Sequence, residues 1–262
     1  MYTLDQAAAA ARLLISNDEQ GTRIQTLPRD IAPSSRAEAY RAQAHWLARS
    51  AKPQAGWKIA ATSVAGQKHI GVDGPLAGIY IAERVVKSGG AIPFGNNHMK
   101  VAEVEFAFVL GRDLPPRDTP YSEDEVFDAV SALHPAIEIP DSRYDRFETV
   151  GAAALIADNA CASWMCLGDA MPETWRQTDL AAFQPVGRIA GKPDAPGKGS
   201  NVLGSPRIAM VWLVNELSAH GIRVRAGEFV TTGTCVVPMP IVKGDHVSGD
   251  FGALGKVSVS LI

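Results

Sequence analysis

From residue 56 onward, glycine and proline divide the chain into short runs that are rich in β-branched and aromatic residues. Runs of this kind, bounded by residues that interrupt regular structure, are typical of β-strands. They read GWKIA, GIYIAERVV, EVEFAFVL, HPAIEIP, ALIADNACASW, FQPVGRIAG, EFVTTGTCVVPMPI and GKVSVSLI. We therefore expect residues 53–262 to form one β-rich domain.

Two alanine-rich segments with apolar residues at helical spacing precede this domain, at residues 3–16 and 36–51. Ser34 or Ser35 can cap the second helix, because a serine side chain accepts a hydrogen bond from the first helical turn. We expect residues 1–52 to form a small helical segment ahead of the β-rich domain.

Two further helices are expected within the β-rich part of the chain. Residues 122–133 carry acids in their first turn, where the helix dipole favours negative charge. Residues 205–220 are followed by Gly221, and glycine is common just after the end of a helix. The chain as a whole is expected to belong to the α+β class.

The overall charge restricts the kind of partner that the chain can bind. The formal net charge is -3 at pH 7 and basic residues do not cluster, which argues against nucleic acid or an anionic membrane as the main partner. No apolar stretch reaches spanning length, and the segment MYTLDQAAAAARLLIS lacks the early basic residues of a signal peptide. We expect a cytoplasmic protein that binds small molecules.

The cysteines argue against a disulfide framework and against a zinc site. Cys161, Cys166 and Cys235 are odd in number and form no CxxC pair. We expect free thiols in a reducing compartment, with Cys161 and Cys166 acting as small packing residues.

Two acids, Glu103 and Glu105, interrupt the otherwise apolar run VAEVEFAFVL at residues 101–110. Side chains at positions i and i+2 of a strand point to the same side, so the two carboxylates would lie close together. A partly buried pair of like charges either takes up a proton or binds a cation such as Mg²⁺. The alternative is an exposed edge strand whose outer face carries both glutamates.

A third acid, Glu138, lies between Ile137 and Ile139 in a second expected strand. Three carboxylates on two strands could form a cage of oxygen ligands, as Mg²⁺ prefers. Cysteine and histidine are missing from this set, which argues against zinc.

Several separate segments, in order along the chain, resemble one known family. They are GWKIAATS at 56–63, the EVEF strand, AIEIPDSRY at 136–144, ADNA at 157–160, the long stretch from GSNVLGSPRIAMVWLVNEL to GEFVTTGT, and the closing DFGALGKVSVSLI. The chain is similar, essentially from end to end, to the 2-hydroxypenta-2,4-dienoate hydratase and 4-oxalocrotonate decarboxylase branch of the fumarylacetoacetate hydrolase superfamily.

This resemblance implies a mixed β-roll body preceded by a small helical domain. It also implies a Mg²⁺ or Mn²⁺ ion held by Glu103, Glu105 and Glu138. Members of the family form dimers or larger rings, and the hydratase and decarboxylase associate with each other. We accordingly expect a homo-oligomer that can form a complex with a pathway partner enzyme.

The activity that the resemblance implies is hydration of a 2-hydroxy-2,4-dienoate of the 2-keto-4-pentenoate type, in the catabolism of aromatic compounds. A 2-oxo or 2-hydroxy acid offers its carboxylate and adjacent oxygen to a divalent ion, which orients the substrate and stabilises an enolate. Lys58, in GWKIA, matches the family lysine and could hold the substrate carboxylate or relay a proton. The alternative is a structural role, in which Lys58 lies at the end of a strand and pairs with a nearby acid.

The chain departs from the family pattern at several expected pocket positions. Hydratases commonly read VDxPDFG where this chain reads VDGPLAG, so Asp73 is kept as a catalytic candidate while a leucine replaces the second acid. Less polar residues also replace parts of the serine-, glycine- and hydroxyl-rich stretches of the family. The residues expected to contact substrate are Leu76, Asp158, Asn159, Cys161 and Thr234.

Three alternative functions remain open from the sequence. One is decarboxylation of a 2-oxo diacid such as 4-oxalocrotonate on the same scaffold. Another is hydrolysis of a C–C bond, for which His69 would activate water from a mobile lid. The last is a non-catalytic assembly partner, which the loss of the acid at Leu76 permits. Retention of the three glutamates and Lys58 argues against a non-catalytic role, because a cluster of like charges destabilises the fold and an inactive site has no physical need for it.

Overall fold

A computed structural model describes residues 2–262 of the chain. The helices are Leu4–Gln20 (α1), Arg36–Gln43 (α2), Val64–His69 (α3), Glu123–Phe127 (α4), Ala152–Ala157 (α5) and Pro206–Ala219 (α6). The strands are Gln54–Ala60 (β1), Leu76–Ile81 (β2), Val85–Lys87 (β3), Ala91–Ile92 (β4), Val101–Leu110 (β5), Val130–Ile139 (β6), Trp164–Leu167 (β7), Val186–Ile189 (β8), Ala195–Pro196 (β9), Phe229–Thr234 (β10), Met239–Pro240 (β11), His246–Asp250 (β12) and Lys256–Leu261 (β13).

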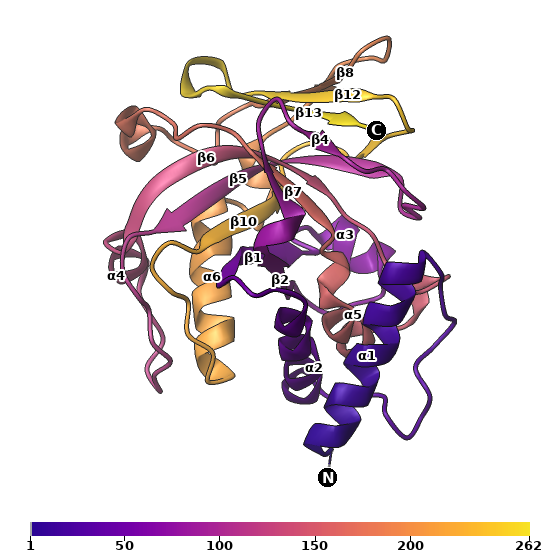
Figure 1. Ribbon diagram of the computed structural model, residues 1–262. Helices are drawn as coiled ribbons and strands as arrows, with labels where there is room; N and C mark the ends of the chain where they lie inside the picture. The colour runs from indigo at the N-terminus through magenta and orange to yellow at the C-terminus, as the bar shows by residue number, and fades with distance from the viewer. Residues whose placement is uncertain (1) are drawn as a thin grey trace.

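Within this range the strands form two sheets. The larger sheet has eight strands, in the order β2-β1-β10-β5-β6-β7-β3 with β11 pairing onto β5, and the smaller has five, in the order β4-β13-β12-β8-β9. In Figure 1 the smaller sheet lies across the top of the molecule, the larger sheet curls beneath it, and α1, α2, α5 and α6 lie below. The expected α+β class is confirmed.

Strand β5 has two chemically different faces, because successive side chains of a strand alternate. Val104, Phe106 and Phe108 are fully buried on one face. The Phe106 ring lies edge-on to that of Phe251, which follows β12 of the smaller sheet, with 5.0 Å between their centroids. The other face carries Glu103 and Glu105, which therefore point away from the smaller sheet.

The expected helix at residues 122–133 is wrong in its second half. The helix begins as expected, since Ser122 and Glu125 form a capping box around the first turn of α4. It ends at Phe127, and strand β6 starts at Val130 and pairs with β5 along its length. The ladder of hydrogen bonds to a long central strand outweighs the local helical signal.

The expected strand across ALIADNACASW is also wrong. Its first part lies in helix α5, and only Trp164 belongs to a strand, β7. Between these elements Asn159, Ala160 and Cys161 adopt left-handed backbone conformations, with φ of 57°, 48° and 62°. We call residues 159–161 the left-handed turn.

The N-terminal helices form where the sequence predicts them. Ser35 caps α2 by accepting a hydrogen bond from Glu38 N, and a 3-10 turn over Ala44–Arg49 replaces the last part of the expected helix. The division of the chain at residue 52 into a separate helical segment stays a prediction.

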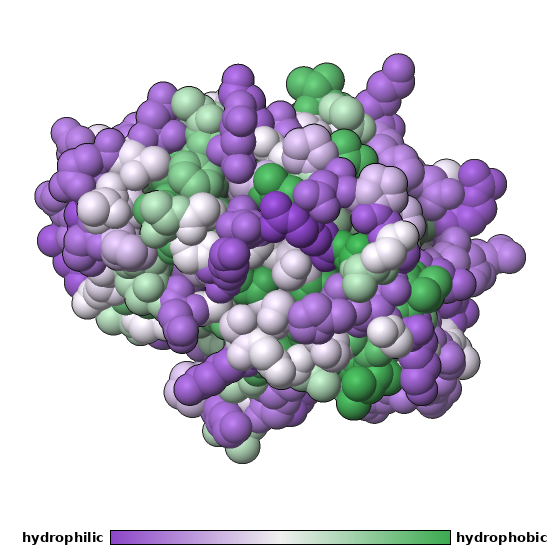
Figure 2. All heavy atoms as spheres, turned by 90° about the horizontal axis from the view of Figure 1, so that it is seen from above, coloured by the Kyte–Doolittle hydropathy of each residue, from purple (hydrophilic) through white to green (hydrophobic). Residues whose placement is uncertain are grey.

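The molecular surface is mostly polar on the side of the smaller sheet. Seen from above in Figure 2, apolar side chains form separate small patches between hydrophilic ones. Among residues 2–262, no helix combines the length and the apolar character needed to cross a bilayer.

Candidate metal centre

The three glutamates that the sequence singled out lie together. Glu103 and Glu105 come from β5, and Glu138 comes from the neighbouring strand β6, where its Cα pairs with that of Glu103. One carboxylate oxygen of each residue lies within 4.8 Å of the others. We call these three side chains the carboxylate cluster. An exposed edge strand is excluded, because β5 pairs with β10 on one side and β6 on the other.

In two of these carboxylates one oxygen is held by the protein and the other is not. Glu105 Oε2 accepts a hydrogen bond of 2.8 Å from the backbone N–H of Gly233. Glu138 Oε1 accepts one of 2.7 Å from the Tyr80 hydroxyl and lies 3.0 Å from Lys58 Nζ. Glu105 Oε1 and Glu138 Oε2 are buried without a hydrogen-bond partner in the described part of the chain. Unpaired buried carboxylate oxygens are costly unless a cation or a proton satisfies them.

Burial and mutual repulsion favour the protonated forms of Glu103 and Glu105 when no cation is present. Burial, followed by the charge of Glu138, raises the pKa of Glu103 to about 7 despite the opposing effect of Lys58. Burial and the charges of Glu138 and Glu103 raise the pKa of Glu105 well above its usual range. An all-oxygen ligand set of this charge fits a hard divalent ion such as Mg²⁺ or Mn²⁺, and such an ion would replace the protons.

Lys58 lies beside the carboxylate cluster, on strand β1. It is almost fully buried, and its Nζ also donates a hydrogen bond of 3.1 Å to the carbonyl oxygen of Ala160. Burial alone would lower the pKa of Lys58, but Glu138 and Glu103 raise it more, so the net direction is upward. Lys58 therefore carries its positive charge, and its expected contact with substrate stays a prediction.

The left-handed turn brings the carbonyl of Ala160 to Lys58, and polar residues hold the turn in place. Asp158 accepts hydrogen bonds from Ser142 Oγ at 2.7 Å and from Arg143 Nε at 2.5 Å. The Asn159 side chain bonds to both the N–H and the carbonyl of Ile79 on β2, at 2.8 and 2.9 Å. The side chains of Asp158 and Asn159 are thus engaged by the protein, and their expected contact with substrate stays a prediction.

The remaining predicted site residues lie at different depths. Leu76 is fully buried on β2, on the same face as Gly78, whose Cα pairs with that of Lys58. Thr234 pairs in register with Glu105, and its hydroxyl donates to the carbonyl of Val236 at 2.8 Å.

Cys161 is buried, and burial raises the pKa of its thiol to about 12. Asp73 is exposed in the loop between α3 and β2, and His69 is exposed at the end of α3. The structure therefore does not show either of these two side chains in contact with the carboxylate cluster.

Two polar residues on the inner face of the larger sheet were not predicted from the sequence. Tyr80 is almost fully buried and contacts Glu138. Thr231, on β10 opposite Ala107, is fully buried, and its hydroxyl oxygen has no hydrogen-bond partner within residues 2–262. Tyr80 could have been noticed, because a buried tyrosine hydroxyl usually finds a polar partner.

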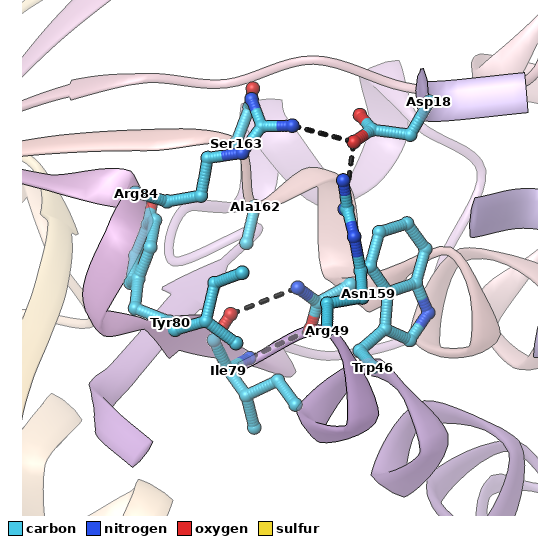
Figure 3. A pocket seen from close by; sticks show the side chains of 10 residues that line it. Asp18, Trp46, Arg49, Ile79, Tyr80, Arg84, Asn159, Ala162 and Ser163 are labelled. Atoms are coloured by element: carbon cyan, nitrogen blue, oxygen red, sulfur yellow. Dashed lines mark hydrogen bonds and ion pairs between the residues drawn. The ribbon is translucent and has the colours of Figure 1, made fainter. Parts of the chain in front are cut away.

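A second group of charges, partly or fully buried, lies between α1 and the larger sheet. The Asp18 carboxylate is 2.7 Å from the guanidinium of Arg49 and 2.7 Å from that of Arg84, and Figure 3 shows both groups pointing at it. These residues line a cavity of about 20 Å³ that Tyr80 also lines. Arg143, the partner of Asp158, also lies 3.7 Å from Asp18. We call these five residues the arginine cluster, consisting of Asp18, Arg49, Arg84, Arg143 and Asp158.

Comparison with known proteins gives a consistent picture. Residues 38–261 match the family described as fumarylacetoacetate (FAA) hydrolase C-terminal. The chain is 31% identical over 254 residues to 2-keto-4-pentenoate hydratase 1 of Dechloromonas aromatica, covering 95% of each protein. It is 34% identical over 203 residues to 2-keto-4-pentenoate hydratase of Paraburkholderia xenovorans, covering 77% of this chain and 74% of that protein.

A solved structure is similar over the whole length. It is 4-oxalocrotonate decarboxylase from Pseudomonas putida G7, complexed with magnesium and adipate, with 25% identity and a TM-score of 0.89 over 100% of this chain and 99% of that one. The expected β-roll with a helical N-terminus is thereby confirmed. Hydratases and decarboxylases of this kind are lyases.

Proposed function

The chain belongs to the fumarylacetoacetate hydrolase C-terminal family, and we propose that it is a divalent-metal-dependent hydratase of a 2-hydroxy-2,4-dienoate of the 2-keto-4-pentenoate type. The observation that carries the metal dependence is the pair of buried, unpartnered oxygens, Glu105 Oε1 and Glu138 Oε2, beside Glu103 within the described residues. Similarity to hydratases over nearly the whole chain supports the choice of reaction.

The ligands of the proposed ion are Glu103, Glu105 and Glu138, and the ion is Mg²⁺ or Mn²⁺. When bound, it supplies a Lewis acid that polarises the oxygen at carbon 2 of the substrate. The chain keeps the opposite ends of two ligands fixed, through Gly233 on Glu105 and through Tyr80 and Lys58 on Glu138. Fixed ligands define where the two oxygens of a 2-hydroxy acid bind.

Lys58 is the proposed binding group for the substrate carboxylate. Its ammonium has three N–H donors and contacts two acceptors, Glu138 Oε1 and the Ala160 carbonyl. These two acceptors hold the ammonium in the absence of substrate, and it has to turn from Glu138 Oε1 to bind a substrate carboxylate. Asp73 is the proposed proton donor or acceptor for hydration, and because it is exposed, the loop between α3 and β2 has to close over the substrate.

The proposed substrate pocket is completed by less polar positions. Leu76 lies on the same face of β2 as Gly78, next to Lys58. We assign Asp158, Asn159, Cys161 and Thr234 to the pocket as well, in the sense that their backbone or side chains shape it around the carboxylate cluster.

A second candidate is decarboxylation of a 2-oxo diacid such as 4-oxalocrotonate. Two observations favour it: the likeness in fold to 4-oxalocrotonate decarboxylase, and the buried Leu76 where hydratases commonly carry an acid. An apolar side chain near a leaving carboxylate favours loss of its charge as carbon dioxide.

We also propose a homo-oligomer located in the cytoplasm, acting in the catabolism of aromatic compounds and able to associate with a pathway partner enzyme. The family resemblance supports this proposal. Light scattering of the purified protein, alone and with a candidate partner enzyme, measures both kinds of assembly.

One experiment tests the function directly. The protein is stripped with EDTA, dialysed, and supplied with 2-hydroxypenta-2,4-dienoate or 4-oxalocrotonate, with and without Mg²⁺ or Mn²⁺. We expect metal-dependent loss of the conjugated absorbance of the dienoate, with incorporation of water into the product. Release of carbon dioxide from the diacid, with no hydration of the dienoate, would select the second candidate.

The matched control for the metal site is Glu228→Gln. Glu228 is another buried glutamate outside the carboxylate cluster, and its Oε2 accepts hydrogen bonds from Trp57 and from the backbone of Arg225. Its Oε1 has no hydrogen-bond partner among the described residues but lies 3.6 Å from the Arg225 guanidinium, and no second carboxylate of the carboxylate cluster accompanies it. Glu105→Gln should abolish metal-dependent turnover and Glu228→Gln should not. Full activity of metal-stripped Glu105→Gln would contradict the metal assignment.

A further inference from the structure

Tyr80 contacts the carboxylate cluster through one oxygen that Lys58 also contacts. The Tyr80 hydroxyl donates to Glu138 Oε1 at 2.7 Å, and Lys58 Nζ lies 3.0 Å from the same atom. The other oxygen of Glu138, Oε2, has no partner among the described residues. Two donors on one oxygen and none on the other fix which oxygen of Glu138 faces the centre of the cluster.

The ring of Tyr80 is held rigidly, so its hydroxyl position is well defined. The residue lies in strand β2 and only 1% of its surface is exposed. The ring packs in a small apolar group with Ala107, Ala136, Ala162, Met165 and Phe229. Its centroid is 5.7 Å from that of Phe229. A donor on a packed strand residue holds its acceptor more firmly than a donor on a long flexible side chain can.

The shared oxygen has a consequence for Lys58. If Lys58 were the only donor to Glu138 Oε1, turning its ammonium toward a substrate would leave a buried carboxylate oxygen without a partner. With the Tyr80 hydroxyl in place, that oxygen keeps a donor when Lys58 leaves it. Tyr80 thereby lowers the cost of moving Lys58 onto substrate.

We propose that Tyr80 is a positioning residue for Glu138 and Lys58: it directs Glu138 Oε2 toward the metal and releases Lys58 to bind the substrate carboxylate. This proposal rests on the proposed function. It predicts that Tyr80 raises the affinity for the metal in the absence of substrate, and separately that Tyr80 raises kcat/KM.

The test compares Tyr80→Phe with a matched variant, Tyr40→Phe. Tyr40 is also a buried tyrosine whose hydroxyl donates to a glutamate, Glu216, at 2.9 Å, outside the carboxylate cluster. Each variant removes one hydroxyl and keeps the ring. Calorimetric titration of the metal-stripped proteins with Mn²⁺ gives the affinity, steady-state kinetics gives kcat and KM, and thermal unfolding gives the melting temperature.

We expect Tyr80→Phe to weaken Mn²⁺ binding by about tenfold, as is typical when a group that orients a metal ligand is removed. We expect kcat/KM to fall about tenfold or more, mainly through a higher KM, because Lys58 is then retained by Glu138 and binds the substrate carboxylate less well. Tyr40→Phe should lower the melting temperature similarly and leave Mn²⁺ affinity and kcat/KM within about twofold of wild type.

A double-variant comparison tests the statement about Lys58. In a Lys58→Met background, Tyr80→Phe should lower kcat/KM much less than it does in wild type, while its loss of Mn²⁺ affinity persists. Equal losses of kcat/KM in the two backgrounds would overturn the release of Lys58.

Mn²⁺ affinity of Tyr80→Phe equal to that of Tyr40→Phe would overturn the positioning of Glu138. A wild type that binds Mn²⁺ but turns over neither substrate class would overturn the proposed function, and the Mn²⁺ titrations would still decide the role of Tyr80.

Discussion

The carboxylate cluster and the arginine cluster are both largely buried, yet their charges are balanced in different ways. In the arginine cluster three guanidinium groups face two carboxylates, and both oxygens of Asp158 accept hydrogen bonds. In the carboxylate cluster three carboxylates face one ammonium, and two of their oxygens lack a partner in the described chain. In the arginine cluster, side chains of the protein neutralise the buried acids. In the carboxylate cluster the protein supplies too little positive charge to do so.

The largest expected effect comes from unbalancing the arginine cluster. Asp158→Asn keeps the shape of the side chain but removes the counter-charge of Arg143, which is fully buried. We expect a loss of about 3–5 kcal/mol in the free energy of unfolding, because Arg143 loses its nearest counter-charge and keeps only the longer contact of 3.7 Å with Asp18. Urea unfolding measures it.

The control for that prediction is Glu173→Gln, which breaks the exposed pair with Arg176 and should cost less than about 1 kcal/mol. If Asp158→Asn unfolds like wild type but loses turnover, then Asp158 serves the substrate and the contrast between the two clusters fails.

Removing an acid from the carboxylate cluster should instead raise the stability of the metal-free protein. Glu105→Gln removes a carboxyl group whose pKa is raised well above its usual range by burial and by its like-charged neighbours, which disfavours the metal-free fold at neutral pH. The metal-free variant should therefore gain about 1 kcal/mol of stability at neutral pH. The same change should weaken Mn²⁺ binding by more than about tenfold, since a ligand is lost. Urea unfolding in EDTA and Mn²⁺ titration check the two halves. A metal-free Glu105→Gln protein less stable than wild type would show that the cluster is structurally balanced after all.

The pH dependence of stability should separate the clusters as well. The arginines hold the pKa of Asp18 below its usual value, although burial acts in the other direction. Asp18 therefore contributes stability that is present above its unfolded pKa and is lost as the pH falls through its lower folded pKa. Glu103, with a folded pKa raised to about 7, disfavours the metal-free fold as the pH rises from about 4.5 to 7.

Unfolding free energies of metal-stripped wild type, Asp18→Asn and Glu103→Gln between pH 3 and pH 8 test these signs. The deficit of Asp18→Asn should disappear in acid, and the advantage of Glu103→Gln should grow toward neutral pH. If the difference in unfolding free energy between a variant and wild type did not change with pH, the pKa shift assigned to that residue would be wrong.

The smallest expected effect concerns Leu76, which adds no charge to the carboxylate cluster. Leu76→Asp should raise the rate of hydration relative to decarboxylation by about threefold or more, because a carboxylate there repels binding of the second carboxylate of a diacid and can move a proton in hydration. Leu76→Asn is the control, since it has the same size as Asp but no charge. Product ratios from both substrates measure the effect. The same ratio in all three proteins would remove position 76 from the mechanism.

The sequence predicted the acids of the candidate site better than their surroundings. Glu103 and Glu105 were predictable, because alternation along a strand places them on one face. Their closeness to Glu138 depends on the register between β5 and β6, which no local pattern encodes. Tyr80 reaches Glu138 only because the sheet curls.

The two wrong elements have a similar cause. Residues 130–133 follow the long ladder to β5 rather than their helical propensity. The left-handed turn is stabilised by contacts of Asp158 and Asn159 with residues far away in the sequence. Such long-range interactions override the local preference for helix or strand, and local sequence patterns cannot predict them.

The left-handed turn has a consequence for how members of this family can be recombined. Asp158 at its start belongs to the arginine cluster, and the Ala160 carbonyl two residues later bonds to Lys58. Through Arg143, Asp18 on the first helix is thus linked by a few contacts to the lysine of the site. Chimeras that exchange residues 1–52 between relatives separate Asp18 and Arg49 from Arg84 and Arg143. Such chimeras should therefore work only when both parents carry matching residues at these four positions, and the two ends of this linkage are expected to diverge together in evolution.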